Sequence, residues 1–334
     1  MRILLCTCRN PDFPTVAEYV EHALGELGHR VNFFDDRRYL LPGRLRRKVR
    51  LLESAELRRI NRGLIRRVSG ASVDACIVAG GYRMLPETVQ ALKRRGVTMA
   101  LWTIDAPRDF DPVLRAAPHY DRVFCGGTEA IEILENHGVD ASWLPFACDT
   151  ELHRPVELSA DDREAYGRDA VFVGSFYSHR LDVFKELAGS SFGIWGPGWQ
   201  KVPADHPLRP HVVPGQTSPE TWKKIYSAAK TVVVAHYQDG KTPCYQASPK
   251  VYEALACGAF VLADDQKDVF RLFEDGTHLV RFTNGNELKE AVDYYAHRPE
   301  ERKRIAEAGR AEVLAKHTYA HRMRRLIKTL NERQ

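Results

Sequence analysis

The sequence predicts an α/β protein built from two doubly wound parallel sheets that follow one another along the chain. Short, continuously apolar segments alternate with amphipathic segments of helical periodicity, a pattern typical of strands buried between two layers of helices. Glycine closes several helical segments, as it often does at a helix C-terminus. The alternation stops at a polar stretch near the middle of the 334 residues and then restarts, which favours two domains.

The first half of the chain carries the first run of alternating segments. Glycine pairs follow two of its strands, at Gly80-Gly81 and Gly126-Gly127. Strands are expected at residues 2–6, 31–34, 74–79, 97–103, 120–125 and 141–144. Helices are expected at residues 15–27, 44–67, 85–95 and 129–137.

The second half begins after the polar connector 153–168. Strands are expected at residues 170–173, 192–195, 212–213, 231–235, 259–263 and 278–282, and helices at 180–188, 219–229, 249–256, 267–273, 287–297, 300–317 and from 319 onward. We therefore expect an N-terminal domain at 1–150 and a C-terminal domain at 151–318. The final basic helix, 319–334, is expected to cross back to the first domain.

Composition excludes several classes of protein. Hydrophobic residues make up 44% and charged residues 28% of the chain, as in globular proteins, and no apolar run approaches the ~20 residues that span a bilayer. The apolar start is too short for a signal peptide. The seven cysteines are odd in number, and no cluster has the spacing of a zinc site. A reduced, cytoplasmic location is expected.

A strongly basic segment lies between Arg37 and Arg67, where twelve Lys and Arg residues face only two acids, Glu53 and Glu56. Such a segment has the charge to bind nucleic acid or an anionic surface. The favoured interpretation is the solvated face of an amphipathic helix, because apolar residues recur at helical spacing opposite the arginines: Leu45, Val49, Leu52, Ile60, Leu64 and Val68.

The stretch Ser248–Asp265 has the best features of a binding site. Ser248 is a good N-cap, Pro249 suits the first helical position, and Gly258 suits the C-terminal stop. The free N–H groups and positive dipole end of such a helix favour a phosphate, and Lys250 adds a charge there. Glu253 lies one turn on, where its carboxylate can accept hydrogen bonds from sugar hydroxyls. The alternative is an ordinary helix and strand with a surface Lys and Glu.

Several segments together resemble a known family. They read VFVGSFYSHR (171–180), SPKVYEALACGAFVLAD (248–264), FEDGTHLVRF (273–282), the helices of 287–322, LWTIDAP (101–107) and WLPFACDTELHRP (143–155). The C-terminal half resembles the donor domain of GT-B glycosyltransferases of the group 1 or family 4 type. The whole chain resembles the subgroup typified by the spore maturation protein CgeB.

The resemblance implies the GT-B fold, in which two Rossmann-like domains face a cleft and the second domain binds a nucleotide-diphosphate sugar. It implies that Glu253 binds the ribose, that Lys250 and Arg180 bind the diphosphate, and that Gly174-Ser175 forms the turn beneath it. The nucleotide base of the donor is expected near Val213 and Tyr226, and Ser248 and Val251 are expected to complete the donor site. Retaining enzymes with an E-x7-E motif carry a Glu where this chain has Tyr245, so the stereochemistry stays open.

Transfer of the sugar requires stabilisation of a leaving group that carries about two negative charges. None of the acidic pairs has D-x-D spacing, so we expect Arg180, Lys250 and the helix start at Ser248 to act without metal or cofactor. These pairs are Asp35-Asp36, Asp161-Asp162 and Asp264-Asp265.

The acceptor hydroxyl must also lose its proton, and Asp105 is the first candidate for the catalytic base. An equally weighted alternative is an Asp that caps the turn before Pro107. Gly80, Gly81, Asp12 and His119 are the other acceptor-side candidates. His236 follows a buried strand and either faces the site or is satisfied by hydrogen bonds within its loop.

The sequence therefore predicts a metal-independent glycosyltransferase with a nucleotide-sugar donor, UDP slightly favoured, and an unknown acceptor. One alternative is an epimerase or hydrolase of the same fold that acts on a nucleotide sugar. The other is a protein that binds nucleic acid or an anionic surface through the arginine-rich helix 44–67.

Overall fold

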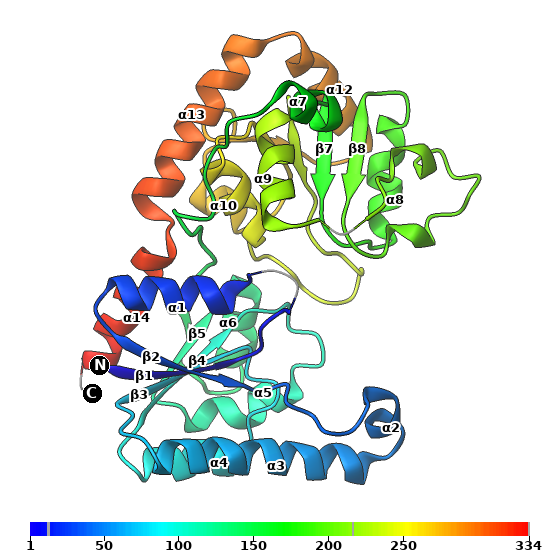
Figure 1. The fold of residues 1–334 in the computed structure, drawn as a ribbon. Helices are drawn as coiled ribbons and strands as arrows, with labels where there is room; N and C mark the ends of the chain where they lie inside the picture. Colours follow the sequence, from blue (N-terminus) through cyan, green and yellow to red (C-terminus); the bar gives the residue numbers. More distant parts are fainter. Residues whose placement is uncertain (12–13, 216, 333–334) are drawn as a thin grey trace. The chain divides into compact units, whose positions relative to one another are not determined.

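The computed structural model describes residues 1–11, 14–215 and 217–332. The chain divides into two compact units. Unit 1 comprises Met1–Pro145 and the C-terminal segment that begins at Tyr319, and unit 2 comprises Phe146–Thr318. Each unit is a parallel sheet with helices packed on it (Figure 1).

Unit 1 contains a sheet with the strand order β2-β1-β3-β4-β5-β6, and neighbouring strands pair in parallel. The strands are β1 (Arg2–Thr7), β2 (Arg30–Asp35), β3 (Ala75–Ala79), β4 (Thr98–Thr103), β5 (Arg122–Cys125) and β6 (Ser142–Trp143). The α-helices are α1 (Val16–Glu26), α2 (Gly43–Lys48), α3 (Arg50–Ser69), α4 (Pro86–Lys93), α5 (Asp111–Ala116), α6 (Thr128–Glu135) and α14 (Tyr319–Asn331).

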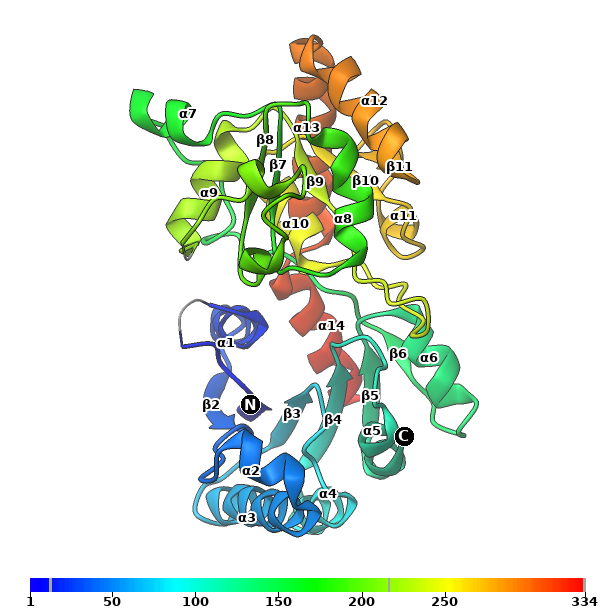
Figure 2. The same ribbon diagram turned by 90° about the vertical axis from the view of Figure 1, so that its right-hand side faces the viewer.

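The apolar runs become the central strands, as predicted. Every residue of β3 is buried, because α3 and α4 lie on one face of the sheet and α1 on the other (Figures 1 and 2). The edge strand β2 has no fully buried residue, which explains its weaker apolar pattern.

The last helix, α14, packs within unit 1. Its Tyr319 ring lies 5.4 Å from that of Tyr19 on α1, and Arg322 Nε donates to the carbonyl of Pro145 over 2.9 Å. The chain thus leaves unit 1 after Pro145 and contributes its final helix to it.

Unit 2 contains a sheet with the order β11-β10-β9-β7-β8, again parallel throughout. The strands are β7 (Ala170–Val173), β8 (Phe192–Trp195), β9 (Val232–Val234), β10 (Val261–Asp264) and β11 (Val280–Phe282). The α-helices are α7 (Ala160–Tyr166), α8 (His179–Phe184), α9 (Pro219–Ala228), α10 (Pro249–Ala256), α11 (Val269–Leu272), α12 (Gly285–Ala296) and α13 (Pro299–Lys316). The predicted fold class, two doubly wound parallel sheets, is confirmed.

The structure corrects the expected basic helix. The chain is extended at Val49, with φ −128° and ψ 100°, so α2 and α3 are separate helices. Ile60, Leu64 and Val68 are buried as predicted, but Leu45 and Val49 are exposed. The break at Val49 ends the helical periodicity that would have placed both side chains on the core face.

Two other helices were not predicted. The polar connector 153–168 contains α7, whose N-cap Ser159 accepts from the N–H of Asp162 while the Asp162 carboxylate accepts from the N–H of Ser159. This capping box forms a helix with no buried residue, so no apolar stripe marks it. The six-residue helix α5 is likewise too short for a clear periodicity.

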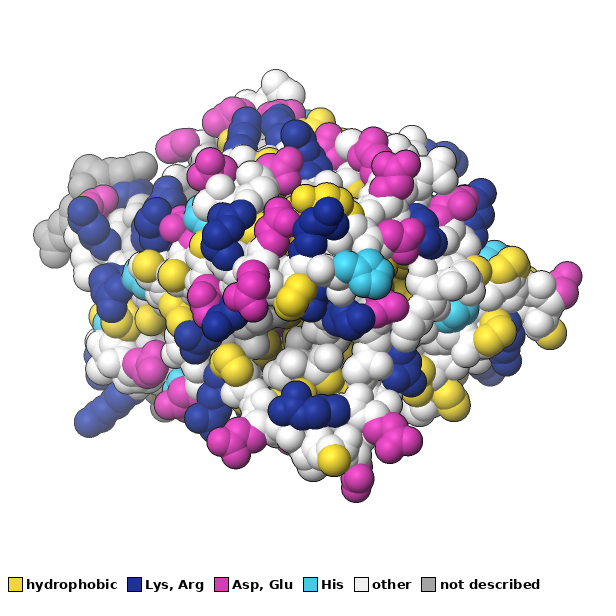
Figure 3. All heavy atoms as spheres, turned by 90° about the horizontal axis from the view of Figure 1, so that it is seen from above, with side chains coloured by type: hydrophobic (Ala, Val, Ile, Leu, Met, Phe, Trp, Pro, Cys, Tyr) yellow, Lys and Arg dark blue, Asp and Glu magenta, His cyan; other side chains and the backbone are white. Residues whose placement is uncertain are grey.

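On the face shown in Figure 3, basic and acidic side chains are interspersed. All seven cysteines lie within the described residues and carry free thiols. Among the helices that the structure describes, none combines the length and the apolar character needed to cross a membrane.

Candidate functional site

The central candidate site lies at the carboxyl ends of β7 and β9. The strand order reverses between these two neighbours: β8 lies on the far side of β7, whereas β10 and β11 follow on the far side of β9. In doubly wound sheets this switch point leaves a crevice where ligands bind. Gly174 follows β7 there and His236 lies just beyond β9.

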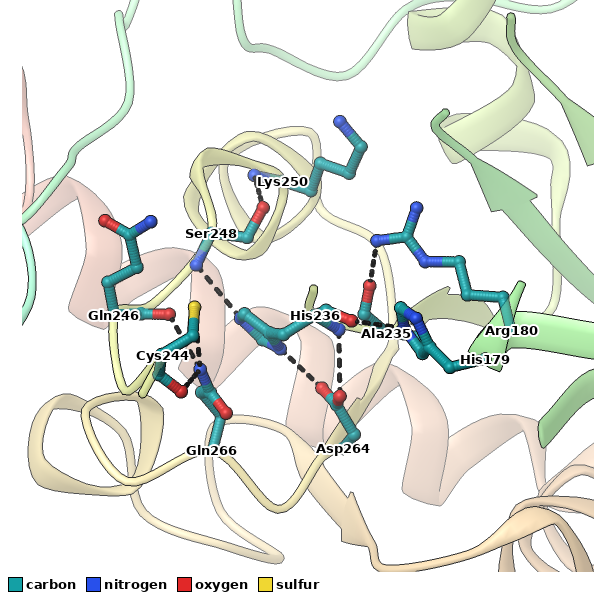
Figure 4. Close-up of polar contacts among 10 residues, drawn as sticks. All are labelled: His179, Arg180, Ala235, His236, Cys244, Gln246, Ser248, Lys250, Asp264 and Gln266. Atoms are coloured by element: carbon teal, nitrogen blue, oxygen red, sulfur yellow. Dashed lines mark hydrogen bonds and ion pairs between the residues drawn. The ribbon is translucent and has the colours of Figure 1, made fainter. Parts of the chain in front are cut away.

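The helix α10 begins beside this switch point and is capped as predicted. The Ser248 hydroxyl accepts from the N–H of Lys250, Pro249 occupies the first helical position, and Gly258 has a left-handed φ of 76° after the last turn. The N–H of Ser248 donates to His236 Nε2 over 2.9 Å, which ties the start of the helix to the end of β9 (Figure 4).

His236 is a positioning residue with both ring nitrogens in hydrogen bonds. Its ring is 2% exposed, and because Nε2 accepts from Ser248, Nδ1 carries the proton and donates to the Asp264 carboxylate at the end of β10. Asp264 also accepts from the His236 N–H over 2.8 Å. The sequence left two interpretations of His236 open, and the structure supports the one in which hydrogen bonds within the protein satisfy the ring. These bonds connect the end of β9, the end of β10 and the start of α10.

Arg180 lies in the first turn of α8 with 5% of its surface exposed. Its guanidinium donates to the carbonyls of Ser175 and Ala235, whereas its Nε has no hydrogen-bond partner among the described residues. Burial lowers the pKa of Arg180 to about 10, which leaves the group charged at neutral pH. No carboxylate forms an ion pair with it in the described part of the chain.

Lys250 extends from the first turn of α10 across the turn after β7. A Cβ atom on Gly174 would lie only 2.8 Å from Lys250 Cε, so glycine leaves room for this side chain. Desolvation lowers the pKa of Lys250, Glu253 opposes that shift, and the nearby charge of Arg180 adds to it. Lys250 and Arg180 extend toward the same side (Figure 4).

The two cations define an anion-binding arrangement. Like Arg180, Lys250 forms no ion pair within the residues that the structure describes. Glu253 and Asp264 are near enough to influence these cations but form no ion pair with them, and desolvated positive charges without an ion-pair partner are costly unless an anion binds beside them. The N–H groups of Ser248 and Lys250 already have partners, so the free N–H groups predicted at this helix start are not available. The two side-chain cations and the positive end of the helix dipole would therefore hold a phosphate or diphosphate here.

Glu253 lies three residues beyond Lys250 on α10 and is partly exposed. Its carboxylate has no hydrogen-bond partner in the described residues, which leaves it available to ligand hydroxyls. Val251 is fully buried in the core, so its side chain cannot line the site. Ser175 is exposed, and its carbonyl accepts from Arg180.

The structure places Val213 and Tyr226, the two residues expected near the nucleotide base, at opposite edges of the sheet. The N–H of Val213 donates to the Ile194 carbonyl of β8, which places Val213 near the carboxyl edge of the sheet. Tyr226 is buried in the last turns of α9, shortly before β9 begins, and lines a pocket with Gly258 and Phe260. That pocket lies at the amino edge of the strands, so Tyr226 is not brought together with the cations.

The structure also shows an aromatic cluster that the sequence did not indicate. The centroid of the Tyr177 ring lies 5.0 Å from that of Tyr237 and 6.0 Å from that of His179, whose ring is nearly parallel to it. His179 Nε2 donates to the carbonyl of His236 over 2.8 Å. Of these rings, the exposed Tyr177 lies against the Arg180 guanidinium, 4.8 Å from ring centroid to Cζ, and offers a stacking surface beside it. Only the folded β7 and β9 loops bring them together, so no sequence spacing could reveal the cluster.

In unit 1 the residues expected on the acceptor side fall into two groups. Gly80 and Gly81 follow β3 with left-handed φ angles of 98° and 87°, and the N–H of Gly80 donates to the Trp102 carbonyl of β4. Asp105 follows β4, so these residues share the carboxyl edge of neighbouring strands.

Asp105 keeps an exposed side chain although the surrounding chain crowds it. Partial desolvation by this surrounding chain raises the pKa of the Asp105 carboxyl, while the charges of Arg37 and Arg83 act in the opposite direction. The influence of these two arginines was not anticipated from the sequence.

His119 ends a 3-10 helix (Ala117–His119) that precedes β5, which places it at the amino edge, where its Nδ1 contacts Gln90 on α4. The structure therefore does not bring His119 together with Asp105. Asp12 lies outside the described residues.

Comparison with known proteins gives two matches in sequence. Residues 176–328 match the family model described as glycosyl transferase-like. The chain is also similar to the spore protein CgeB of Bacillus subtilis (strain 168), at 22% identity over 260 residues that cover 74% of this chain and 79% of CgeB. These matches confirm the resemblance noted from the sequence.

Solved structures agree at the level of the fold. The chain is similar to sucrose-phosphate synthase from Thermosynechococcus elongatus, with a TM-score of 0.74, 14% identity and 99% of both chains covered. It is also similar to Anabaena HepE in complex with UDP-glucose, with a TM-score of 0.66, 12% identity and 99% of both chains covered. The chain has the fold of the GT-B glycosyltransferases.

Proposed function

Because the chain has the GT-B fold and its residues 176–328 match glycosyl transferase-like proteins, we propose that it transfers a sugar from a nucleotide-diphosphate sugar to an acceptor. The observation that carries the proposal is the pair of cations at the switch point of unit 2. Lys250 in the first turn of α10 and Arg180 in the first turn of α8 have no carboxylate in an ion pair with them among the described residues, which leaves both available to a diphosphate.

The donor site follows from the same geometry. The diphosphate lies against Arg180, Lys250 and the N-terminus of α10, whose positive charge increases its hold on the leaving group as the glycosidic bond breaks. Glu253 accepts hydrogen bonds from the ribose hydroxyls. These protein cations supply the charge stabilisation, so the proposed reaction proceeds without metal or cofactor.

The nucleotide is proposed to be UDP. Support comes from Anabaena HepE, whose solved complex contains UDP-glucose. The acceptor is left unspecified. The free thiols fit a cytoplasmic enzyme, which we include in the proposal.

Asp105 is the proposed base that takes the proton of the acceptor hydroxyl. Its exposed carboxylate follows a central strand of unit 1 beside the Gly80-Gly81 turn, and a raised pKa makes a carboxylate a better proton acceptor near neutral pH. The assignment applies to an inverting reaction.

A thermal-shift screen with UDP, GDP, dTDP, CDP and ADP, run with and without EDTA, tests the proposal. One nucleotide should stabilise the protein, by about 2.7 kcal/mol at a hundred times its Kd, in the presence of EDTA as well. Glu253→Ala should lose most of this response. Asp105→Asn is the matched control, because it removes a carboxylate from unit 1 and should respond like the wild type.

The proposal is wrong if none of the five nucleotides stabilises the wild-type protein. It is equally contradicted if Glu253→Ala and Asp105→Asn respond alike, because the nucleotide would then bind elsewhere. Loss of the response in EDTA would overturn the metal-independent mechanism alone.

A further inference from the structure

An exposed apolar surface lies where α2 joins α3. Leu40, Leu45, Val49 and Leu51 are 73%, 53%, 46% and 80% exposed. The described residues contain only two other exposed large hydrophobic side chains, Tyr177 and Tyr294, and both lie in unit 2. We call Leu40, Leu45, Val49 and Leu51 the α2 patch. Single exposed leucines need no explanation, but four within twelve residues of chain do.

The break at Val49 creates the α2 patch. A continuous helix would have turned Leu45 and Val49 toward the sheet with Ile60 and Leu64, but the extended backbone at Val49 redirects the chain. The hydrophobic stripe covers the core only from Ile60 onward, so packing within unit 1 does not account for the four side chains.

Hydrogen bonds hold the α2 patch in place. The Arg46 guanidinium bridges α2 and α3, because it donates to Glu53 over 2.6 Å and to the Leu41 carbonyl over 3.0 Å. The N–H of Leu40 donates to the Glu56 carboxylate over 2.9 Å, and Arg59 pairs with the same carboxylate. The segment that carries the four exposed apolar side chains is therefore held to α3 at Leu40 and Arg46.

Because Glu53 and Glu56 are already paired with Arg46 and Arg59, the other basic side chains around the α2 patch have no neighbouring acid of this segment to pair with. Glu53 and Glu56 are the only acids between Arg37 and Arg67, and Arg46 and Arg59 occupy them. Arg44, Lys48 and Arg50 alternate with the apolar residues of the patch, are exposed, and have no carboxylate partner among the described residues.

We propose that the α2 patch and its cations, Arg44, Lys48 and Arg50, dock the protein on an anionic lipid bilayer. Leucine and valine side chains gain free energy by entering the boundary between headgroups and acyl chains, while basic side chains beside them bind anionic headgroups. Nucleic acid would use the cations but would leave the exposed leucines in water. The inference is independent of the nucleotide site.

Vesicle cosedimentation of the full-length chain tests the proposal. The wild type should bind vesicles of phosphatidylcholine mixed with phosphatidylglycerol and bind phosphatidylcholine vesicles much more weakly. A variant with Arg44→Gln, Lys48→Gln and Arg50→Gln should lose roughly a hundredfold in affinity for the mixed vesicles, at roughly fivefold per charge. The control variant with Lys185→Gln, Lys303→Gln and Arg304→Gln removes three exposed cations of unit 2 and should bind like the wild type.

A second variant separates the lipid from other polyanions. Leu40→Ser with Leu51→Ser keeps every charge and should weaken vesicle binding by roughly tenfold or more. Both side chains are mostly exposed, so an unchanged melting temperature is expected and can be checked. Duplex DNA serves as the competing polyanion.

Failure of the wild type to bind the mixed vesicles overturns the proposal. So does a Leu40→Ser, Leu51→Ser variant that binds them as well as the wild type does, since the leucines would then have no role. Tight, salt-dependent binding of duplex DNA that these serine substitutions leave unchanged, without vesicle binding, would assign the surface to nucleic acid instead.

Discussion

At the scale of single residues, the proposed binding of a diphosphate by Arg180 and Lys250 rests on the desolvation of both cations. A surface lysine would be hydrated and would contribute little, but here desolvation lowers the pKa of Lys250 and so weakens its hold on the proton. An anion beside the ammonium reverses that effect. The desolvation of Lys250 therefore destabilises the unbound protein, and a diphosphate bound as proposed would reduce that cost.

The lowered pKa of Lys250 predicts how nucleotide binding depends on pH. The folded protein loses this proton before the unfolded chain does, so its stability rises with pH through the window below the ordinary value of 10.5. Nucleotide affinity changes in the opposite direction, because the anion binds the charged form. UDP affinity measured by calorimetry should fall as the pH rises through the lowered pKa, by up to about tenfold per pH unit.

Lys250→Arg is the matched control for this pH dependence. Its guanidinium stays charged, so the alkaline loss of affinity should flatten, while ionisation of the nucleotide itself is common to both proteins. If the two proteins show the same decline, Lys250 does not bind the diphosphate.

His236 illustrates a limit of sequence interpretation at this scale. A histidine after a buried strand is compatible with a catalytic role and with a structural one, and its own neighbours in sequence cannot decide between them. The partners that decide, Ser248 and Asp264, come from later elements. Hydrogen bonds between elements become visible only in the fold.

At the scale of elements, the placement of α10 depends on close packing against α13. Gly309 of α13 lies where a Cβ atom would approach the His278 carbonyl oxygen to 2.2 Å and Leu255 Cδ2 to 2.8 Å. Arg310 Nε also donates to the Ala256 carbonyl at the end of α10. The glycine thus allows α13 to approach α10 and the chain before β11 closely.

Gly309→Ala should destabilise the protein, although alanine favours a helix. Because a backbone carbonyl must move to make room, we expect the free energy of unfolding, measured in urea, to fall by about 1 to 3 kcal/mol. Gly25→Ala is the matched control in α1, because its Cβ atom meets nothing within 4 Å and should leave stability equal or higher. Equal stability of the two variants would contradict the packing described here.

Elements with a strong apolar pattern were predicted well, and those without one were not. The capped helix α10 and the strands β3, β7 and β8 lie close to their expected bounds. The break between α2 and α3 was missed, because the apolar periodicity runs through Val49 without a Pro or Gly to mark the turn. What stops the helix there is backbone geometry that no residue type at that position requires.

At the scale of the whole molecule, the alternation of segments along the chain was sufficient for the fold class. Parallel sheets buried between helices produce a recognisable pattern of short apolar segments in the sequence, because both faces of each central strand must be apolar. The same pattern places glycine turns and helix starts at the carboxyl edges of strands. Ser248 and Lys250 could therefore be grouped from the pattern of residues, whereas Gly174 and Arg180 were added to them by the resemblance to glycosyltransferases.

The rest of the site depends on which edge of the sheet each loop reaches. Tyr226 and His119 lie on segments that lead into strands, so both fall at the amino edges, away from the proposed chemistry. Residue type alone does not carry that information. The roles of the grouped residues stay predictions that binding experiments must test.

The most direct test of the central claim compares UDP with uridine by calorimetry, in the wild type and in Lys250→Met. If Lys250 and Arg180 bind the diphosphate, the wild type should prefer UDP over uridine strongly, and Lys250→Met should reduce that preference by about tenfold or more while leaving uridine binding unchanged. Lys303→Met, which removes an exposed cation of α13, should behave like the wild type. A preference for UDP that Lys250→Met leaves intact would contradict the account.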